Sequence, residues 1–305
     1  IRGELTDIKA KYGDRRRTKI VGAVSEPEVQ AEDFIIAEDA NVILSSQGWV
    51  KRAREIKDLS STRLRDGDAV LGAVAGSTRA SVAFFSNLGA CYVCRIHDVP
   101  ASTGYGDPVQ KLFKLADGER MIAMLSFDPR ALAVEAPTEG AVEPEPPFAL
   151  AVTRGGLGFR FSLRPHREPS TRAGRKFAKL NEGDEVLAVL LAEPRAAVLC
   201  AASDGHALGV PVDELGVLAG VGKGAMVMKV SDGERLIGAV IAATKRDTIT
   251  IETEKGKTLE LERHKIQGAR ADKGDLIVKR DRFVRVVLPA VAPPVLDTSN
   301  DPKVS

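Results

Sequence analysis

The sequence predicts an all-β, propeller-like fold of about five four-stranded blades, because one hairpin pattern repeats five times along the chain. In every repeat an apolar run of about five residues ends at a polar turn whose fourth residue is glycine, and a second apolar run follows. The turns occupy residues 45–48, 86–89, 153–156, 202–205 and 253–256. Repeats of about 40 to 50 residues built from such hairpins bury their apolar faces against their neighbours.

A second turn, in which glycine follows an acidic residue, shows where the repeats differ. Its glycines are Gly67, Gly118, Gly183 and Gly233. The two turn glycines are 29, 27 and 28 residues apart in repeats two to four but 19 apart in the first, so the first repeat lacks about nine residues. The gap after Gly118 is about sixteen residues longer than the others, which predicts an acidic, proline-rich insertion near 129–147. In the fifth repeat, residues 279–282 stand where the second turn is expected.

The two ends of the chain read differently from the repeats. Ile1, Leu5 and Ile8 follow a helical period, and the predicted helix ends near Tyr12 and Gly13, within a first segment 1–20. Residues 21–40 are polar without periodicity and are expected to form a linker, with the blades over 41–288. The tail 289–305 is rich in Pro, Asp and Ser and is expected to be disordered. The chain begins with Ile1 rather than methionine, so we expect it to be part of a longer protein.

The charge of the chain is unevenly distributed. The net charge over 305 residues is only +2, and the hydrophobic content of 44% can supply a core. Between residues 152 and 180, however, eight cations face a single acid, Glu168. The near-neutral sum therefore hides a strongly basic segment.

The sequence offers little that could support catalysis or metal binding. Cys91 and Cys94 resemble half of a zinc site, but they lie in a strand-like run that places them on opposite faces, and no second pair exists. The glycine cluster around Lys223 fails the spacing of a phosphate-binding loop, and the four histidines are scattered over different repeats. Three cysteines favour a reducing compartment, and no apolar run is long enough to cross a membrane. We expect a cytoplasmic chain without catalytic residues of its own.

Glycine is interleaved with cations in the loop that follows the hairpin of several repeats. The basic instances are 172–176, 222–224 and 270–274, and 104–107 is a less basic counterpart. Glycine allows close approach to a partner, and Lys and Arg supply charge for phosphate oxygens. One such loop alone is also explained as a solvated turn, but recurrence at one position predicts a curved cationic track along one rim. The predicted contact residues are Lys51, Arg52, Arg154, Arg172, Arg175, Lys176, Lys223, Arg270 and Lys273.

The residues also resemble a known family. Residues 11–18 resemble the end of the breakage-reunion core in A subunits of bacterial type IIA topoisomerases. Residues 42–51 are similar to the first-blade hairpin of the topoisomerase IV A subunit, and 172–175 to its third-blade loop. The resemblance covers about residues 1–288 and implies a β-pinwheel, a propeller variant whose blades exchange strands. It also implies that double-stranded DNA is bound without sequence preference and presented to the cleavage gate.

One departure from the family bears on the activity. Gyrase A subunits resemble this chain but carry a seven-residue box in the first-blade loop, and here that loop is the short segment 57–65. The nine missing residues fall in the same interval, which favours decatenation and relaxation over the wrapping and negative supercoiling of gyrase. The gyrase-type wrapping domain remains the alternative.

The resemblance further implies partners and cofactors outside this chain. The family's catalytic tyrosine would precede Ile1, so Tyr12, Tyr92 and Tyr105 are not assigned that role. The breakage-reunion core would contact the ATPase B subunit and form the A-subunit homodimer. ATP and Mg²⁺ would act in other domains. A second class of function is a protein-interaction propeller that docks through the acidic insertion. A standalone enzyme is a third, and the apolar runs offer it no convergent carboxylates or histidines.

Overall fold

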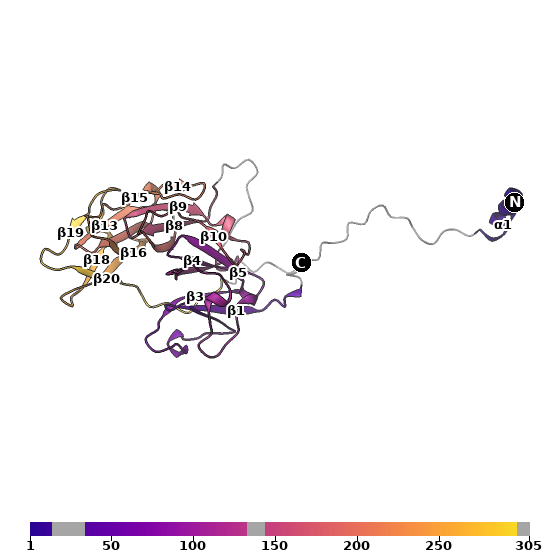
Figure 1. Cartoon of the computed structure of the whole chain (residues 1–305), viewed down its shortest axis with the longest axis horizontal. Coiled ribbons are helices and arrows are strands. Elements are labelled where there is room, and N and C mark those ends of the chain that lie inside the picture. The colour runs from indigo at the N-terminus through magenta and orange to yellow at the C-terminus, as the bar shows by residue number, and fades with distance from the viewer. Residues whose placement is uncertain (14–33, 133–143, 298–305) are drawn as a thin grey trace. The chain divides into compact units, whose positions relative to one another are not determined.

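The computed structural model describes residues 1–13, 34–132 and 144–297 of the chain (Figure 1). Most of the predicted linker, the centre of the predicted insertion and the end of the predicted tail lie outside these ranges. The predicted helix is confirmed as α1 (Arg2–Tyr12), where the Gly13 amide donates to the Lys9 carbonyl at 2.9 Å. No residue of α1 is buried.

The described residues of 35–132 and 144–297 form five sheets that follow one another along the chain, so the propeller-like fold is confirmed. The first sheet has the order β3 (Val70–Ser77), β1 (Asp39–Ser45), β2 (Trp49–Ala53), β6 (Asp107–Pro108). The second has the order β10 (Arg175–Lys176), β5 (Ala90–Arg95), β4 (Ser81–Ser86), β7 (Met121–Ser126). The third has the order β11 (Val186–Leu191), β8 (Phe148–Thr153), β9 (Leu157–Ser162), β14 (Val217–Leu218), and β15 (Ala225–Met226) also pairs with β9.

The fourth sheet has the order β16 (Leu236–Ala242), β12 (Ala197–Ala202), β13 (His206–Pro211), β19 (Asp275–Leu276). The fifth contains β18 (Thr258–Glu262), β17 (Thr248–Thr253), β20 (Phe283–Val287). Short 3₁₀ helices lie between them: η2 (Leu59–Ser61), η3 (Ile96–Asp98), η4 (Val109–Lys111), η5 (Arg164–His166), η6 (Val212–Glu214), η7 (Arg263–Lys265). We call the sheets blades one to five in chain order.

Neighbouring blades exchange strands, as the resemblance implied. Four short strands each belong by sequence to one blade but pair with the second hairpin strand of the preceding blade. They are β6, β10, β15 and β19. The five blades lie in an arc. On its inner side, the opposite edge strand of each blade contacts that of the next blade, in the order β3, β7, β11, β16, β20. The exchanged strands (β6, β10, β15, β19) therefore form its outer edge, as β15 and β19 do in Figure 1.

The nine residues missing from the first repeat correspond to an absent exchanged strand. In blades two to five the segment between the hairpin and the inner strand contains one, whereas in blade one this segment contains only η2. Correspondingly, β18 of blade five pairs only with β17, so the fifth blade has three strands rather than the predicted four. Among the described residues, no strand exchange joins blade five to blade one.

The core lies between the blades rather than within them. In β4, Val82 and Phe84 pack toward blade one, and Ala83 and Phe85 pack toward blade three. Successive side chains of a strand point to opposite faces, so a strand with a blade on each side is apolar throughout. Four such clusters join the five blades in sequence, and the described residues contain no comparable cluster between blades five and one.

An acidic side chain next to the second turn fastens each hairpin. Asp68 accepts from the Ser46 hydroxyl at 2.7 Å and from the Gln47 amide at 3.0 Å, and Asp184 accepts from the Gly155 amide at 2.9 Å. Burial raises the pKa of Asp68, but hydrogen bonds from the Ser45 and Ser46 side chains and from backbone amides outweigh it and hold the pKa below its ordinary value. The equivalent residues in the other blades are Glu119, Glu234 and Asp281. Asp281 explains why residues 279–282 replace the second turn in the fifth repeat.

The chain continues past β20 and returns to the other end of the arc. Val291 and Leu296 are half-buried, and the Asp297 amide donates to the Arg130 carbonyl at 3.1 Å. Arg130 lies directly after blade two. The segment 288–297 therefore links the end of blade five to the region of blades one and two.

Replacing the buried histidine of the core with phenylalanine is expected to improve stability in acid. His166 is 7% exposed between Phe85 and Phe161, its Nδ1 has no hydrogen-bond partner, and burial lowers its pKa to about 4. The unfolded chain binds a proton below about pH 6.5 and the folded chain does not, so stability is lost between about pH 6.5 and 4, by about 3 kcal/mol.

In urea unfolding at several pH values, H166F should lack this loss. The control H264Q removes an exposed histidine and should keep it. Equal acid sensitivity of H166F and the unsubstituted chain would contradict the assignment.

Candidate nucleic-acid interface

The outer edge of the arc carries most of the predicted contact residues. The residues immediately before the exchanged strands form four equivalent loops, which we call the exchange loops: 102–106, 170–174, 220–224 and 270–274. They contain Arg172, Lys223, Arg270 and Lys273, and Arg175 and Lys176 form β10 itself. The loops therefore occupy the same topological position in successive blades.

The glycines of these loops have a structural role that differs from the predicted one. Gly224 has φ +77°, and a Cβ atom on it would lie 2.4 Å from the Gly158 carbonyl oxygen. Gly274 has φ +79°, with the Ala207 carbonyl oxygen 2.3 Å from the same position. Only glycine tolerates both this backbone conformation and this approach. The close partner of these glycines is thus the hairpin strand of the preceding blade.

Two predicted arginines use several donors within the chain. Arg172 donates to the carbonyls of Leu112 at 3.2 Å and Lys111 at 3.0 Å, at the end of η4 in the preceding blade. Arg175 donates to the carbonyls of Pro165 at 2.8 Å and Pro169 at 3.0 Å. The acceptors are neutral carbonyls, so these hydrogen bonds position the loops without supplying a counterion to either guanidinium group.

Four further candidates are exposed and make few contacts. Lys176 donates to the Leu88 carbonyl at 2.8 Å, and Lys223 donates to Asn181 Oδ1 at 2.5 Å. Arg270 donates to the Met226 carbonyl at 3.3 Å. Lys273 lies 3.4 Å from Asp204 Oδ2. Three of these four contacts leave the positive charge without a counterion.

The structure does not favour Lys51 as a surface contact. Its side chain is 5% exposed, and Nζ donates to the carbonyls of Arg63 and Gly104, both at 2.8 Å. Burial, with a contribution from nearby Arg63, lowers the pKa of Lys51. Arg52 is half-buried, and its Nε donates to the Val99 carbonyl at 3.2 Å.

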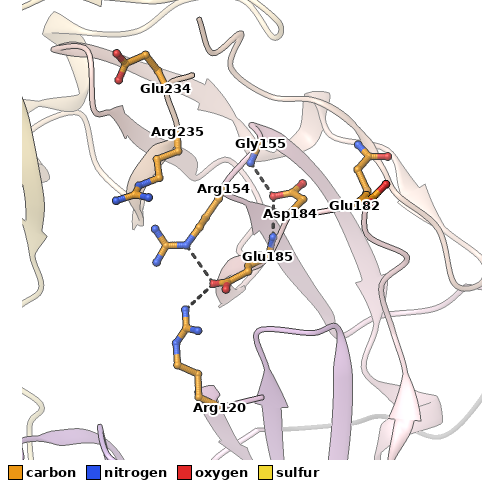
Figure 2. A pocket seen from close by; sticks show the side chains of 10 residues that line it. Arg120, Arg154, Gly155, Glu182, Asp184, Glu185, Glu234 and Arg235 are labelled. Carbon is orange, nitrogen blue, oxygen red and sulfur yellow. Dashed lines mark hydrogen bonds and ion pairs between the residues drawn. The ribbon is translucent and has the colours of Figure 1, made fainter. Parts of the chain in front are cut away.

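Arg154 lies in the turn between β8 and β9 and contacts the start of the inner strand β11, not an exchange loop (Figure 2). Arg154 Nε is 3.3 Å and Arg120 Nη2 is 2.7 Å from the same Glu185 oxygen. Hydrogen bonding from Arg120 first, and then the charges of both arginines, hold the pKa of Glu185 low. These groups and Arg235 line a pocket of about 670 Å³. The structure therefore separates Arg154 from the cations of the exchange loops.

A second set of exposed cations was not predicted from the sequence. Its members, Arg63, Lys114, Lys179 and Lys229, each stand four residues before a second-turn glycine. This constant spacing is the signal that could have identified them.

The described residues offer no metal site or reactive thiol. Within the described ranges, no group of three or more His, Cys, Asp or Glu side chains could hold a metal ion. Cys91 packs toward blade three and Cys94 toward blade one, and burial raises the pKa of both thiols. The predicted opposite orientation is confirmed. In the part of the chain that the structure describes, no helix combines the length and apolarity needed to span a membrane.

Comparisons with known proteins agree with the fold. The family described as the DNA gyrase C-terminal domain, a beta-propeller, matches residues 148–193. The DNA gyrase A subunit of Aminobacterium colombiense is 28% identical over 81% of this chain and 29% of its own length. That of Pseudomonas aeruginosa is 26% identical over 82% of this chain and 31% of its own length. The chain thus spans about a third of the length of the curated relatives it matches.

Two solved structures share the fold. The C-terminal domain of a DNA topoisomerase IV superposes with a TM-score of 0.70 at 19% identity, covering 83% of this chain and 78% of its own. The E. coli ParC C-terminal domain gives 0.64 at 22% identity, with coverages of 83% and 99%. The predicted similarity to the C-terminal domains of type IIA topoisomerase A subunits is confirmed.

Proposed function

We propose that this chain, a relative of the C-terminal domains of type IIA topoisomerase A subunits, binds duplex DNA along its outer edge. The observation that carries the proposal is the recurrence of cations in equivalent exchange loops, as in Arg172, Lys223 and Lys273. Phosphate neutralisation and DNA shape give affinity without base-edge contacts, so little sequence preference is expected. In the complete protein, the domain would present a bent segment to the cleavage gate, while ATP, Mg²⁺ and the B subunit would serve other domains.

Decatenation and relaxation are the activities that we assign to the complete subunit. The short first-blade segment, which lacks an exchanged strand, supports this assignment. The names of the sequence relatives favour the alternative, wrapping and negative supercoiling. A topology assay of the complete subunit with its ATPase partner separates the two. Unlinking of catenated rings without supercoiling of relaxed circles would support our assignment, and supercoiling would overturn it.

Removing three exposed lysines of the outer edge is expected to weaken DNA binding uniformly across sequences. K176A/K223A/K273A avoids Arg172 and Arg175, whose replacement would also disturb the loops. Each lost phosphate contact should lower the slope of log affinity against log salt by about 1, so the triple variant should lose about 3. Fluorescence anisotropy with duplexes of unrelated sequence measures both quantities.

The matched control is K245A/K257A/K265A, which removes three exposed lysines of blade five outside the exchange loops. It should change the slope by less than about 1. Equal behaviour of the two triple variants would contradict binding at the outer edge. Absence of DNA binding by the unsubstituted chain would overturn the proposal itself.

A further inference from the structure

The unpredicted cations Arg63, Lys114, Lys179 and Lys229 lie where consecutive blades meet. Each belongs to the segment that runs from the hairpin of its blade toward the inner strand. All four are exposed. We call them the seam cations.

Backbone hydrogen bonds join the seam lysines to the exchange loops of the next blade. The Lys114 amide donates to the Arg172 carbonyl at 2.7 Å. The Lys179 amide donates to the Gly222 carbonyl at 2.9 Å, and the Lys229 amide to the Asp272 carbonyl at 2.9 Å. Each bond reaches a residue that carries a cation or directly precedes one. The seams between blades two and three, three and four, and four and five therefore each bring together one cation from either blade.

The seam between blades one and two keeps the same connection with a different donor. Here the Lys51 ammonium, rather than a backbone amide, donates to the carbonyls of Arg63 and Gly104. Lys51 thus holds the exchange loop of blade two against Arg63. The exchange loop of this seam contributes no cation, because Gly104 and Tyr105 stand where the later loops carry Arg172 or Lys223.

The charges of the seam lysines are available to a ligand. Within the described ranges, none of Lys114, Lys179 and Lys229 forms an ion pair. An acidic residue follows each of them three positions later, but no ion pair joins the two in these ranges. An exposed ammonium on a flexible stem suits a phosphate oxygen, since it can follow the backbone of a duplex without a fixed geometry.

We propose that the seam lysines are phosphate contacts that carry a DNA duplex from one blade to the next. This inference rests on the proposed DNA-binding function and adds residues and a path to it. The path runs through the three seams that hold cation pairs. It ends at blade five, because no strand exchange and no further seam follow that blade among the described residues.

The first test compares K114A/K179A/K229A with the control K245A/K257A/K265A in the full 305-residue chain. At about 0.1 M salt the seam variant should bind a duplex about 500-fold more weakly, since each lost phosphate contact removes about 0.9 log unit of affinity there, and its salt slope should fall by about 3. The control should change the slope by less than about 1. Thermal unfolding midpoints show that the fold is retained. The glutamine triple K114Q/K179Q/K229Q, which keeps part of each aliphatic stem, replaces the alanine variant if alanine lowers the midpoint.

The second test locates the contacts along the DNA by hydroxyl-radical footprinting. K229A should shorten the protected segment at one end only, because its seam is the last of the path. K179A should open protection in the middle and leave both ends in place. A purely structural role of the lysines would weaken protection evenly.

The two tests separate the possible failures. If the unsubstituted chain binds DNA and the seam variant behaves like the control, the seam proposal is wrong and the outer-edge proposal survives. If the unsubstituted chain does not bind DNA, both are overturned. If K179A and K229A each weakened protection uniformly along the DNA, the seam path would also be overturned.

Discussion

G224A is expected to destabilise the protein by about 3 kcal/mol, the combined cost of left-handed backbone for a residue with a Cβ atom and of overpacking. Gly224 has φ +77°, and an added Cβ would lie 2.4 Å from the Gly158 carbonyl oxygen and 2.7 Å from Phe159 Cδ1. Gly158 and Phe159 belong to β9, with which the exchanged strand β15 pairs. The substitution therefore disrupts the pairing that joins blade four to blade three.

G183A is the matched control for this prediction. Gly183 has φ +73°, but a Cβ on it would meet nothing within 4 Å. The same change should then cost only the backbone term, about 1 kcal/mol. Urea unfolding gives the difference between the two variants, which measures the close approach alone. Equal losses would show that the crossing is not tight.

R130A is expected to destabilise the protein by about 3 kcal/mol, because it leaves a buried carboxylate without its positively charged partner. Asp128 is 2% exposed, and Arg130 Nη2 lies 3.0 Å from its Oδ2, which also accepts from the Ser77 amide at 2.6 Å. Arg130 Nη1 lies 3.1 Å from Asp39 Oδ2. The arginine thereby joins the first strand of blade one to the exit of blade two.

Acid should reduce the difference in the free energy of unfolding between R130A and the unsubstituted chain. Burial raises the pKa of Asp128, but hydrogen bonds from Arg130 and Ser77 outweigh it, so the folded pKa is lowered. A lowered carboxyl pKa contributes stability above the unfolded value of about 4, and this stability is lost as pH falls through the folded pKa. Denaturant unfolding at neutral pH and below about pH 4 should show the gap narrowing.

R285A serves as the comparison for R130A. Arg285 also makes a two-bond pair, with Glu252 at 2.6 and 2.8 Å, but both side chains are accessible to solvent. Exposed pairs contribute little, so R285A should leave the unfolding midpoint nearly unchanged. A loss with R285A as large as that with R130A would refute burial as the reason for the effect.

Much of the architecture could be predicted from the sequence because it depends on local pattern. The glycine-terminated turns predict the hairpins, and the interval of 19 rather than 27 to 29 residues locates the segment that the structure shows without an exchanged strand. Asp68 and its equivalents stand at a fixed place beside the second turn. Such features need only a few neighbouring residues to form.

The candidate site was predictable in part. Arg172, Lys223 and Lys273 lie in equivalent loops, as expected from their recurrence. Lys51 was predicted to contact DNA but is buried. Two carbonyls bind its ammonium group, and one of them is 53 residues away along the chain, so the sequence pattern near Lys51 does not reveal the burial. The seam lysines were not predicted as contacts because they lie outside the glycine-rich loops in the sequence. Only the folded chain brings them to these loops, through hydrogen bonds that the backbone amides of Lys114, Lys179 and Lys229 donate.

The sequence by itself determined the number of hairpin units, their all-β character, the defect in the first unit and the types of residue that carry charge. Only the tertiary structure decided which strand completes which sheet and which cations meet across blades. The physical reason is that a two-residue strand such as β10 has no periodicity of its own. It becomes a strand because Gly174 brings it against Cys91, more than eighty residues earlier in the chain.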